Sequence, residues 1–161
     1  MPIVIVTGTP GTGKTTIAKL IAQKLKLEYM DANKLIKEKK LAAGYDKKRN
    51  CDIIDDKKLK KEFIELTKRS KNLVIDSHMS HLLPAKYTNI CIVTKCDLKV
   101  LKGRLKKRGY SHSKIRENLD AEIFDNCLVE AEENRHNVLI VDTSKEINHK
   151  KLIKVIQTKL K

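Results

Sequence analysis

Hydrophobic and polar positions divide the chain into two alternating kinds of segment. Four short runs are almost wholly apolar and rich in β-branched residues, which is typical of strands buried on both faces: residues 3–6, 73–75, 90–93 and 138–141. Residues 27–30 form a weaker fifth run after the first helical segment. Because such strands need helices on each side, the pattern predicts an α/β fold with a five-stranded parallel sheet flanked by helices.

The helices are predicted from apolar residues that recur every three or four positions. Four such stripes lie between or after the strand-like runs: Ile17, Leu20, Ile21 and Leu25; Leu59, Phe63 and Leu66; Leu98, Leu101 and Leu105; and Leu152, Val155, Ile156 and Leu160. Each stripe is expected to pack on the sheet and to carry no chemistry. A length of 161 residues suits a single domain, 1–161, built around this sheet.

Two segments interrupt this alternation. Residues 31–56 are polar, with Gly44 in their middle, and residues 108–116 form an irregular connection between two helical patterns. Ligands of open α/β sheets bind beyond the carboxyl ends of the strands, where insertions can cover a substrate. We therefore interpret both segments as candidate substrate covers; ordinary surface loops are the alternative.

The sequence GTPGTGKTT, residues 8–16, contains the pattern G-x-x-x-x-G-K-[ST]. It follows the first predicted strand and opens the first predicted helix, which is the order found in phosphate-binding P-loops. In such a loop, backbone N–H groups turn toward phosphate oxygens and the helix N-terminus favours negative charge. Lys14 is expected to reach the β- and γ-phosphates, and the Thr15 hydroxyl to bind Mg²⁺.

Asp76 follows the apolar run at residues 73–75 and is the candidate second Mg²⁺ residue, binding directly or through water. An aspartate that only forms a turn at a strand end is the alternative. His78, two residues further on, points to the same side as Asp76 if the chain stays extended. A neutral imidazole there can orient a water or an acceptor group, and a solvated loop histidine is the other reading.

Arg104 and Arg108 lie one turn apart at the end of a predicted helix. Arginines beside a phosphate site can neutralise a transferring phosphoryl group, whereas a basic helix C-terminus is also favoured by the helix dipole. Arg108 is the better candidate because it opens the second irregular segment. Residues 94–97, Thr-Lys-Cys-Asp, are similar to the guanine-reading motif of G proteins, but no D-x-x-G precedes them; Asp97 is predicted to cap the helix instead.

The formal net charge of +15 favours attraction to nucleic acid or other polyanions. A generally Lys-rich surface explains the charge as well, because aromatic residues make up only 4 % and do not alternate with the basic ones. The four cysteines include no C-x-x-C pair, and Cys91 and Cys127 are expected to be buried, reduced thiols. No apolar run approaches the roughly 18 residues of a membrane helix, so we expect a cytoplasmic protein without a membrane partner.

The chain resembles the isoenzyme 6 type of adenylate kinase, a small nuclear-type adenylate kinase and ATPase family with archaeal members, implicated in small ribosomal subunit maturation. The resemblance rests on GTPGTGKTT, on G-Y-D with C-x-I-x-D within residues 44–55, on D-S-H at 76–78, on R-G-Y at 108–110 and on E-N-L-D-A-E-I-F at 117–124. It covers nearly the whole chain, and the D-x-H motif is its most specific part.

The resemblance implies a P-loop fold of the nucleoside monophosphate kinase type. It implies a segment that binds the monophosphate at about residues 31–54 and a short lid at about residues 107–117. It further implies ATP contacts from Gly11, Gly13, Lys14, Thr15, Thr16 and Arg108, Mg²⁺ at Thr15 and Asp76, and catalytic roles for Lys14, Asp76, His78 and Arg108. The implied partners are ATP, AMP, a ribosomal protein of the small-subunit platform and rRNA.

The chain also departs from ordinary adenylate kinases, which carry D-G-F/Y-P-R after this strand, with the arginine on the AMP phosphate. Here the run is D-S-H-M-S, and the arginines between residues 31 and 76 are Arg49 and Arg69. Ser77 stands where the family often has tyrosine. Two functions are therefore expected: transfer of the γ-phosphoryl group of MgATP to AMP with some ATP hydrolysis, or an ATPase assembly factor that acts on a ribosomal protein and has little kinase activity.

Overall fold

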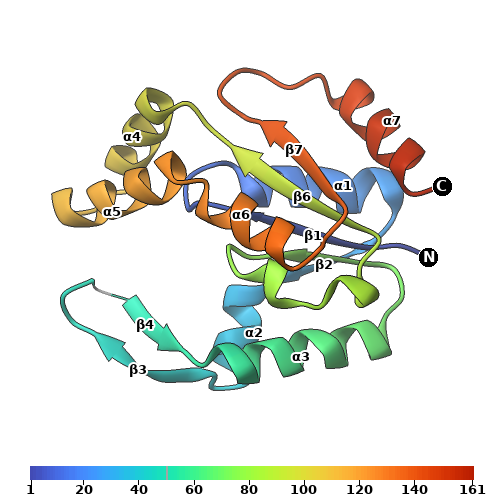
Figure 1. Cartoon of the computed structure of the whole chain (residues 1–161), viewed down its shortest axis with the longest axis horizontal. Coiled ribbons are helices and arrows are strands. Elements are labelled where there is room, and N and C mark those ends of the chain that lie inside the picture. The colour runs from blue at the N-terminus through green and yellow to red at the C-terminus, as the bar shows by residue number, and fades with distance from the viewer. Residues whose placement is uncertain (50) are drawn as a thin grey trace.

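The computed structural model describes residues 1–49 and 51–161. Its centre is a sheet of five parallel strands in the order β2-β5-β1-β6-β7, which confirms the predicted sheet (Figure 1). β1 (Ile3–Gly8) lies in the middle, β5 (Leu73–Asp76) and β2 (Glu28–Asp31) lie on one side, and β6 (Ile90–Lys95) and β7 (Val138–Asp142) lie on the other. The weak fifth run is therefore a strand, displaced by one residue from its predicted start.

Helices cover both faces of this sheet, because successive side chains of each strand point to opposite faces. One face packs on α2 (Ala32–Glu38), α3 (Asp56–Arg69) and α6 (Asn126–Glu133). The other packs on α1 (Lys14–Leu25) and α7 (His149–Lys159). This double coverage explains why the strands are continuous apolar runs rather than alternating ones.

Beyond the carboxyl end of the sheet, α4 (Leu98–Lys107) and α5 (His112–Ile123) form a third, smaller core. Most of the predicted helical stripes are buried, as expected. Leu98 and Val155 are exceptions, since 41 % and 38 % of their surfaces are exposed, so the stripe prediction is wrong at these two positions. Leu98 and Val155 each lie at one edge of the apolar face that their stripe forms on the helix.

The polar insertion contains secondary structure that its composition does not indicate. After α2 the chain forms an antiparallel hairpin of β3 (Ala42–Asp46) and β4 (Cys51–Ile54), which projects from the rest of the molecule in Figure 1. The hairpin strands are largely exposed, so they lack the apolar run by which the sheet strands are recognised. Asp31 ends β2 and caps α2 by accepting the Asn33 N–H at 2.9 Å.

The second irregular segment is shorter than predicted. α4 ends at Lys107 and α5 begins at His112, so the prediction of irregular structure as far as residue 116 is wrong. Ser111 starts α5 by accepting the Lys114 N–H at 3.2 Å, and Ile115 of its first turn is buried in the third core. The non-helical connection is therefore limited to residues 108–111.

The remaining connections and the thiols complete the fold. Two short 3₁₀ turns, η1 (Ser80–Leu82) and η2 (Ala85–Tyr87), join β5 to β6. The four cysteines are free thiols; Cys91 is buried as predicted, whereas Cys127 is only partly buried. Over the described part of the chain, none of the helices combines the length and the apolar character needed to cross a bilayer.

Candidate active site

The loop between β1 and α1 has the backbone conformation that its glycines permit. Gly8 has a φ of 151°, and a Cβ added there would lie 2.3 Å from Thr94 Oγ1. Gly13 has a φ of 88° and occupies the left-handed N-cap position of α1. The first turn of α1 thus begins directly at this loop, with its unpaired N–H groups and positive dipole end available for an anion.

Arg104 stabilises this loop through hydrogen bonds. Its guanidinium donates to Gly11 O at 3.3 Å and to Thr143 O at 2.6 Å, and the Thr143 hydroxyl donates to Thr12 O at 2.5 Å. Because the Arg104 guanidinium links the P-loop to the end of β7 through these hydrogen bonds, it is not placed to contact phosphate. Arg108, one turn further on, is exposed.

A pocket of about 810 Å³ opens over the P-loop and brings the predicted site residues together. Its walls include every candidate that the sequence indicates: Gly11, Gly13, Lys14, Thr15, Thr16, Asp76, His78 and Arg108. The pocket also extends to the polar insertion, from which Asp46, Arg49, Cys51 and Asp52 line it. The partly buried thiol of Cys127 lines the same pocket.

Asp76 is held by two hydroxyl groups. Its Oδ2 atom accepts from Thr15 Oγ1 at 2.7 Å and from Tyr29 OH at 2.7 Å, and only 5 % of the residue is exposed. A threonine hydroxyl next to a carboxylate is the hard-oxygen set that Mg²⁺ prefers. The oxygen atoms of Thr15 and Asp76 therefore fit a Mg²⁺ ion.

Sequence reasoning missed Tyr29. Its burial, and its hydrogen bond to the Asp76 carboxylate, raise the pKa of the phenol well above its ordinary value, so Tyr29 remains a donor throughout the neutral range. The signal that points to it is the register of the sheet, since β2 runs beside β5 and pairs Asp31 with Asp76. That pairing is visible only in the folded sheet.

Lys14 lies over the P-loop, where its Nζ donates to Thr9 O at 3.3 Å. Burial away from water lowers the pKa of its ammonium from 10.5 to about 8, although Cys127 and Asp76 oppose the shift. A bound polyanion would stabilise the charged form of the ammonium and so raise the pKa of Lys14.

We expect ATP binding at pH 8 to take up about half a proton, since Lys14 is about half protonated there in the free protein. Because the bound state carries the extra proton, ATP affinity should fall as pH rises from 7 to 9. Calorimetric titrations in buffers of different ionisation enthalpy measure the uptake. Lys14→Arg, which cannot deprotonate, is the control and should show none of this uptake; equal uptake in both proteins would contradict the assignment to Lys14.

His78 is exposed and lines the pocket. Loss of hydration, together with the positive charge of the Lys14 ammonium, lowers the pKa of the His78 imidazole from 6.5 to about 4. His78 is therefore neutral at pH 7, which is the form that can orient a water or an acceptor hydroxyl.

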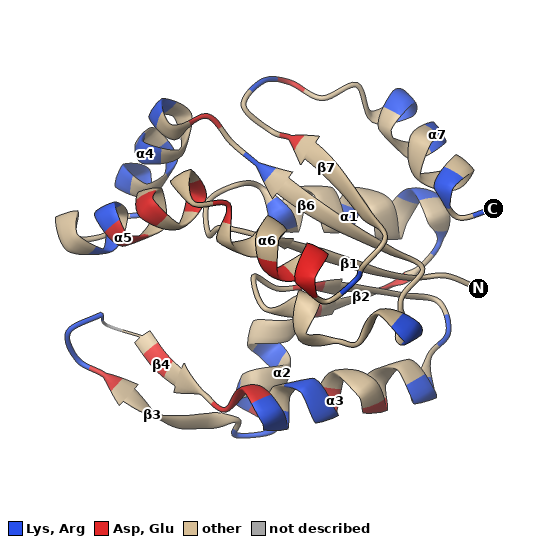
Figure 2. Ribbon diagram, in the orientation of Figure 1, with Lys and Arg blue, Asp and Glu red and all other residues tan. Residues whose placement is uncertain are grey.

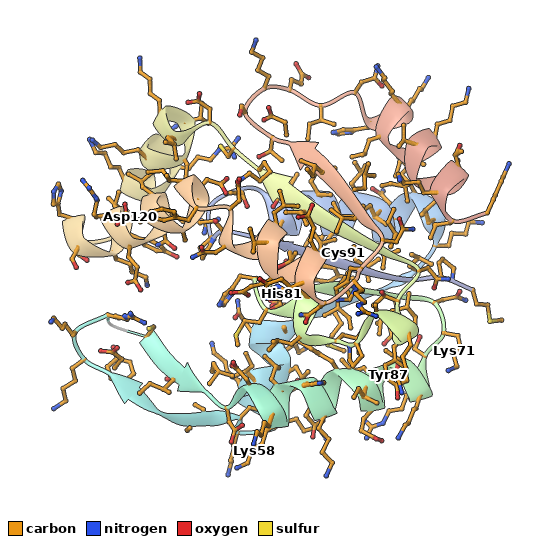
Figure 3. The ribbon with its side chains drawn as sticks, in the orientation of Figure 1. Lys58, Lys71, His81, Tyr87, Cys91 and Asp120 are labelled. Carbon is orange, nitrogen blue, oxygen red and sulfur yellow. The ribbon has the colours of Figure 1, made fainter. Side chains whose placement is uncertain are left out.

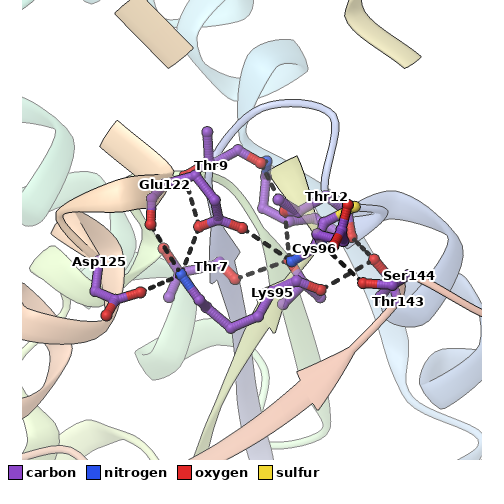
Figure 4. Close-up of polar contacts among 12 residues, drawn as sticks. Thr7, Thr9, Thr12, Lys95, Cys96, Glu122, Asp125, Thr143 and Ser144 are labelled. Atoms are coloured by element: carbon purple, nitrogen blue, oxygen red, sulfur yellow. Dashed lines mark hydrogen bonds and ion pairs between the residues drawn. The ribbon is translucent and has the colours of Figure 1, made fainter. Parts of the chain in front are cut away.

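Lys95 belongs to the motif at residues 94–97 that is similar to a guanine-reading sequence, and it takes part in a network of polar contacts (Figure 4). Lys95 Nζ contacts Glu122 Oε1 at 2.6 Å and also Asp125. Glu122 further accepts from Thr9 Oγ1 at 3.3 Å and from Cys96 N at 2.9 Å, which ties α5 to the P-loop. This network confines the Lys95 side chain.

Asp97, the last residue of the same motif, accepts the N–H groups of Lys99 and Val100 at 2.9 and 3.3 Å. These bonds confirm the prediction that Asp97 is the N-cap of α4. Lys95 and Asp97 both make structural contacts, so neither side chain is available to bind a guanine base.

The insertion side of the pocket is acidic, although the whole chain carries a net charge of +15. Its walls there include Asp31, Asp46, Asp52 and Asp56, and Glu117 of α5 lines the pocket opposite the hairpin. Arg49 pairs with Glu117 at 3.2 Å and with Asp46 at 3.8 Å, so the hairpin contacts α5 across the pocket mouth. Figure 2 shows that Lys and Arg lie on α3, α4 and α7, and also on the loop between β3 and β4.

Comparison with known proteins places this fold and site in a family. Residues 4–125 match the family model described as an AAA domain. Two proteins named adenylate kinase isoenzyme 6 homolog are similar over most of their length. The one from Dictyostelium discoideum is 37 % identical over 141 residues, covering 88 % of this chain and 80 % of that protein. The one from Caenorhabditis elegans is 34 % identical over 146 residues, covering 90 % and 80 %.

Solved structures share the fold at lower identity. Shikimate kinase from Acinetobacter baumannii in complex with shikimate aligns with a TM-score of 0.61 at 17 % identity, covering 98 % of this chain and 92 % of that one. Deoxyadenosine kinase from M. mycoides with bound dCTP aligns with a TM-score of 0.55 at 20 % identity, covering 98 % of each chain. Both are P-loop kinases, which agrees with the sheet and the loop described above. From its matches to the isoenzyme 6 homologs, this chain belongs to the adenylate kinase isoenzyme 6 family.

Proposed function

We propose that this protein transfers the γ-phosphoryl group of MgATP to AMP, giving two ADP, and that it also hydrolyses ATP. The observation that carries the proposal is the hydrogen bond between Thr15 and Asp76 at the end of the P-loop, beside the partly buried Lys14. In phosphoryl transfer the protein contributes mainly position and charge neutralisation. Lys14 and Arg108 would supply positive charge, and Thr15 and Asp76 would hold a Mg²⁺ ion, which when bound would add positive charge beside the phosphates.

The shape of the pocket supports an acceptor on the insertion side. The P-loop and Arg108 form one part of its wall, and residues of the hairpin form another, so two ligands can meet over Asp76 and His78. We assign residues 31–54 as the segment that binds the monophosphate. We assign residues 107–117 as the lid, with Arg108 as its ATP-contacting residue; residues 108–111 are its non-helical part.

A second function, ATP hydrolysis in the service of ribosome assembly, is favoured by the acidic insertion wall. The four carboxylates there, Asp31, Asp46, Asp52 and Asp56, repel a phosphate dianion. Among the described residues between 31 and 76, Arg49 is the one lysine or arginine that lines the pocket. Neutral His78 beside Asp76 suits a water nucleophile. In this version the protein acts in the cytoplasm on a small-subunit ribosomal protein, and its basic surface meets rRNA.

Product analysis separates the two functions. MgATP is incubated with the protein alone, with AMP, and with the candidate ribosomal protein, and ATP, ADP and phosphate are measured over time. The kinase proposal predicts strong dependence on AMP with two ADP formed per ATP consumed. Turnover that is independent of AMP and stimulated by the ribosomal protein would replace it with the ATPase function.

Replacing Arg49 with alanine tests the acceptor side. We expect Arg49→Ala to raise the KM for AMP about 10-fold and to leave the KM for ATP unchanged, because a guanidinium is the side chain best suited to a terminal phosphate. Initial rates at varied AMP and fixed saturating ATP give the comparison. Arg69→Ala is the matched control, because Arg69 ends α3 outside the pocket. An unchanged KM for AMP in Arg49→Ala would exclude Arg49 from acceptor binding.

A further inference from the structure

One buried carboxylate beside the P-loop has no part in the chemistry described so far. Glu122 lies near the end of α5, and only 5 % of its surface is exposed. The outer side of the same helix carries Asp120, labelled in Figure 3, whose carboxylate pairs with Arg116 at 3.3 Å. Residues two positions apart on a helix point to nearly opposite sides, so Glu122 points inward. A buried carboxylate needs donors for its oxygens.

Both carboxylate oxygens of Glu122 accept from other elements of the fold (Figure 4). Oε1 accepts from Lys95 Nζ at 2.6 Å and from Thr9 Oγ1 at 3.3 Å, and Oε2 accepts from the Cys96 N–H at 2.9 Å. An ammonium and a backbone N–H can only donate, so each oxygen faces a group that needs an acceptor. Glu122 therefore joins the end of α5 to the end of β6 and to the P-loop.

Thr9 is the P-loop residue that Glu122 holds. Only 2 % of its surface is exposed, so its hydroxyl lies in the interior and needs an acceptor, which Glu122 supplies. The carbonyl oxygen of Thr9 accepts from Thr12 N at 3.1 Å, from Thr12 Oγ1 at 2.6 Å and from Lys14 Nζ at 3.3 Å. The position of Thr9 therefore sets the turn of the loop and the place of the Lys14 ammonium.

The negative charge of Glu122 does not explain its place behind this loop. A carboxylate there repels a bound phosphate, and the repulsion is strongest where water is excluded. Lys95 offsets part of this charge, but Lys95 also pairs with Asp125. Glu122 raises the pKa of Lys14, yet less than Cys127 and Asp76 do. The hydrogen bonds of Glu122, rather than its charge, are therefore what the P-loop gains from it.

We infer that Glu122 is a positioning residue, which holds Thr9 from α5 and so keeps the P-loop in the form that receives the phosphates of a nucleotide. The inference rests on the proposed function only in taking the P-loop as the phosphate site, and it is independent of the acceptor. Arg104 of α4 holds the same loop at Gly11 O. The helices on both sides of the connection at residues 108–111 are therefore fixed to the P-loop.

Two replacements of Thr9 isolate its bond to Glu122. Thr9→Val keeps the shape of the side chain and removes the hydroxyl, whereas Thr9→Ser keeps the hydroxyl. We expect the Mg²⁺ complex of β,γ-imido-ATP to bind about 10-fold more weakly to Thr9→Val, and within about 2-fold of wild type to Thr9→Ser. Rescue by serine identifies the hydrogen bond, because a role in packing alone would favour valine. Thr9→Val also leaves the pair of Lys95 and Glu122 intact, so it avoids an unpaired buried charge.

Glu122→Met tests the other end of the bond. Methionine has a similar length and offers no carboxylate acceptor, so we expect the analogue to bind at least about 10-fold more weakly. If the charge of Glu122 alone mattered, its removal would strengthen binding instead. Asp125→Asn is the matched control, because it removes the other carboxylate from Lys95 and keeps the bond to Thr9. Its affinity should stay within about 2-fold of wild type.

The double variant Thr9→Val/Glu122→Met shows whether the two side chains act through one bond. Once Glu122 is replaced, the Thr9 hydroxyl has lost the acceptor that it uses in the native protein. We therefore expect the double variant to bind no more than about 2-fold more weakly than Glu122→Met alone. A further loss of about 10-fold from Thr9→Val in that background would show that the hydroxyl acts through another group, against the inference.

Calorimetric titration with Mg²⁺ and β,γ-imido-ATP at pH 7 measures these affinities without turnover. Inorganic tripolyphosphate is the second probe, because it offers phosphates and no base, and the same losses are expected with it. Thermal unfolding midpoints show that each variant is folded at the temperature of the titration. Equal losses in Thr9→Ser and Thr9→Val, or tighter binding in Glu122→Met, would overturn the inference. No acceptor is present, so this result is separate from the choice between AMP and water.

Discussion

Lys14→Ala is expected to lower turnover of MgATP about 1,000-fold. The Lys14 ammonium is a positive group held over the P-loop, where its Nζ donates to Thr9 O, and burial lowers its pKa. In the proposed reaction, charge that develops on the transferring phosphoryl group would be neutralised mainly by Lys14, Arg108 and Mg²⁺. Preorganised groups of this kind typically change rates by about 10² to 10³ each.

Steady-state rates of ADP formation measure the effect, and Lys24→Ala is the matched control. Lys24 lies on the same helix, α1, but it is exposed and outside the pocket. Its replacement should leave the rate within about 2-fold of wild type, as expected for a surface position. Full activity in Lys14→Ala would show that the loop does not hold the phosphates in the proposed way.

Asp76→Asn is expected to lower kcat about 100-fold or more and to raise the Mg²⁺ concentration needed for half-maximal rate. The amide oxygen can still accept from Thr15 and Tyr29, so the fold should be retained, but the negative charge that attracts Mg²⁺ is lost. Rates are measured as a function of Mg²⁺ at saturating nucleotide. A thermal unfolding midpoint close to that of wild type would show that the loss is chemical.

The chain offers a close control in Asp142→Asn. Asp142 also ends a strand of the sheet, β7, but it is exposed, and its carboxylate accepts the Ser144 N–H at 2.8 Å outside the pocket. This variant should keep its Mg²⁺ dependence. If Asp76→Asn behaved in the same way, Asp76 would be only a turn-forming residue at the end of β5.

The features predicted correctly are those set by nearby residues. The apolar runs indicate the five strands because burial on both faces requires apolar side chains at every position. The P-loop is recognised because its glycines, Lys14 and Thr15 act within one strand–loop–helix unit. Asp97 is likewise predictable as an N-cap, since a cap involves only the next three residues.

The features that sequence reasoning missed depend on contacts between distant parts of the chain. Tyr29 reaches Asp76 only because β2 pairs with β5, and Glu122 reaches Thr9 only because the end of α5 lies beside the P-loop. The hairpin in the insertion is polar and exposed, so no apolar run marks its strands. The second irregular segment was predicted too long because the packing of Ile115 against α4 extends the helix to its N-cap.

The destination of the γ-phosphoryl group tests the central claim most directly. ATP labelled with ³²P at the γ position is incubated with Mg²⁺, AMP and the protein, and the labelled products are separated. We predict that the label appears in the β position of ADP, in proportion to the ATP consumed and in amounts that rise with AMP. Label released only as inorganic phosphate, at a rate indifferent to AMP, would contradict the assignment of this site to phosphoryl transfer.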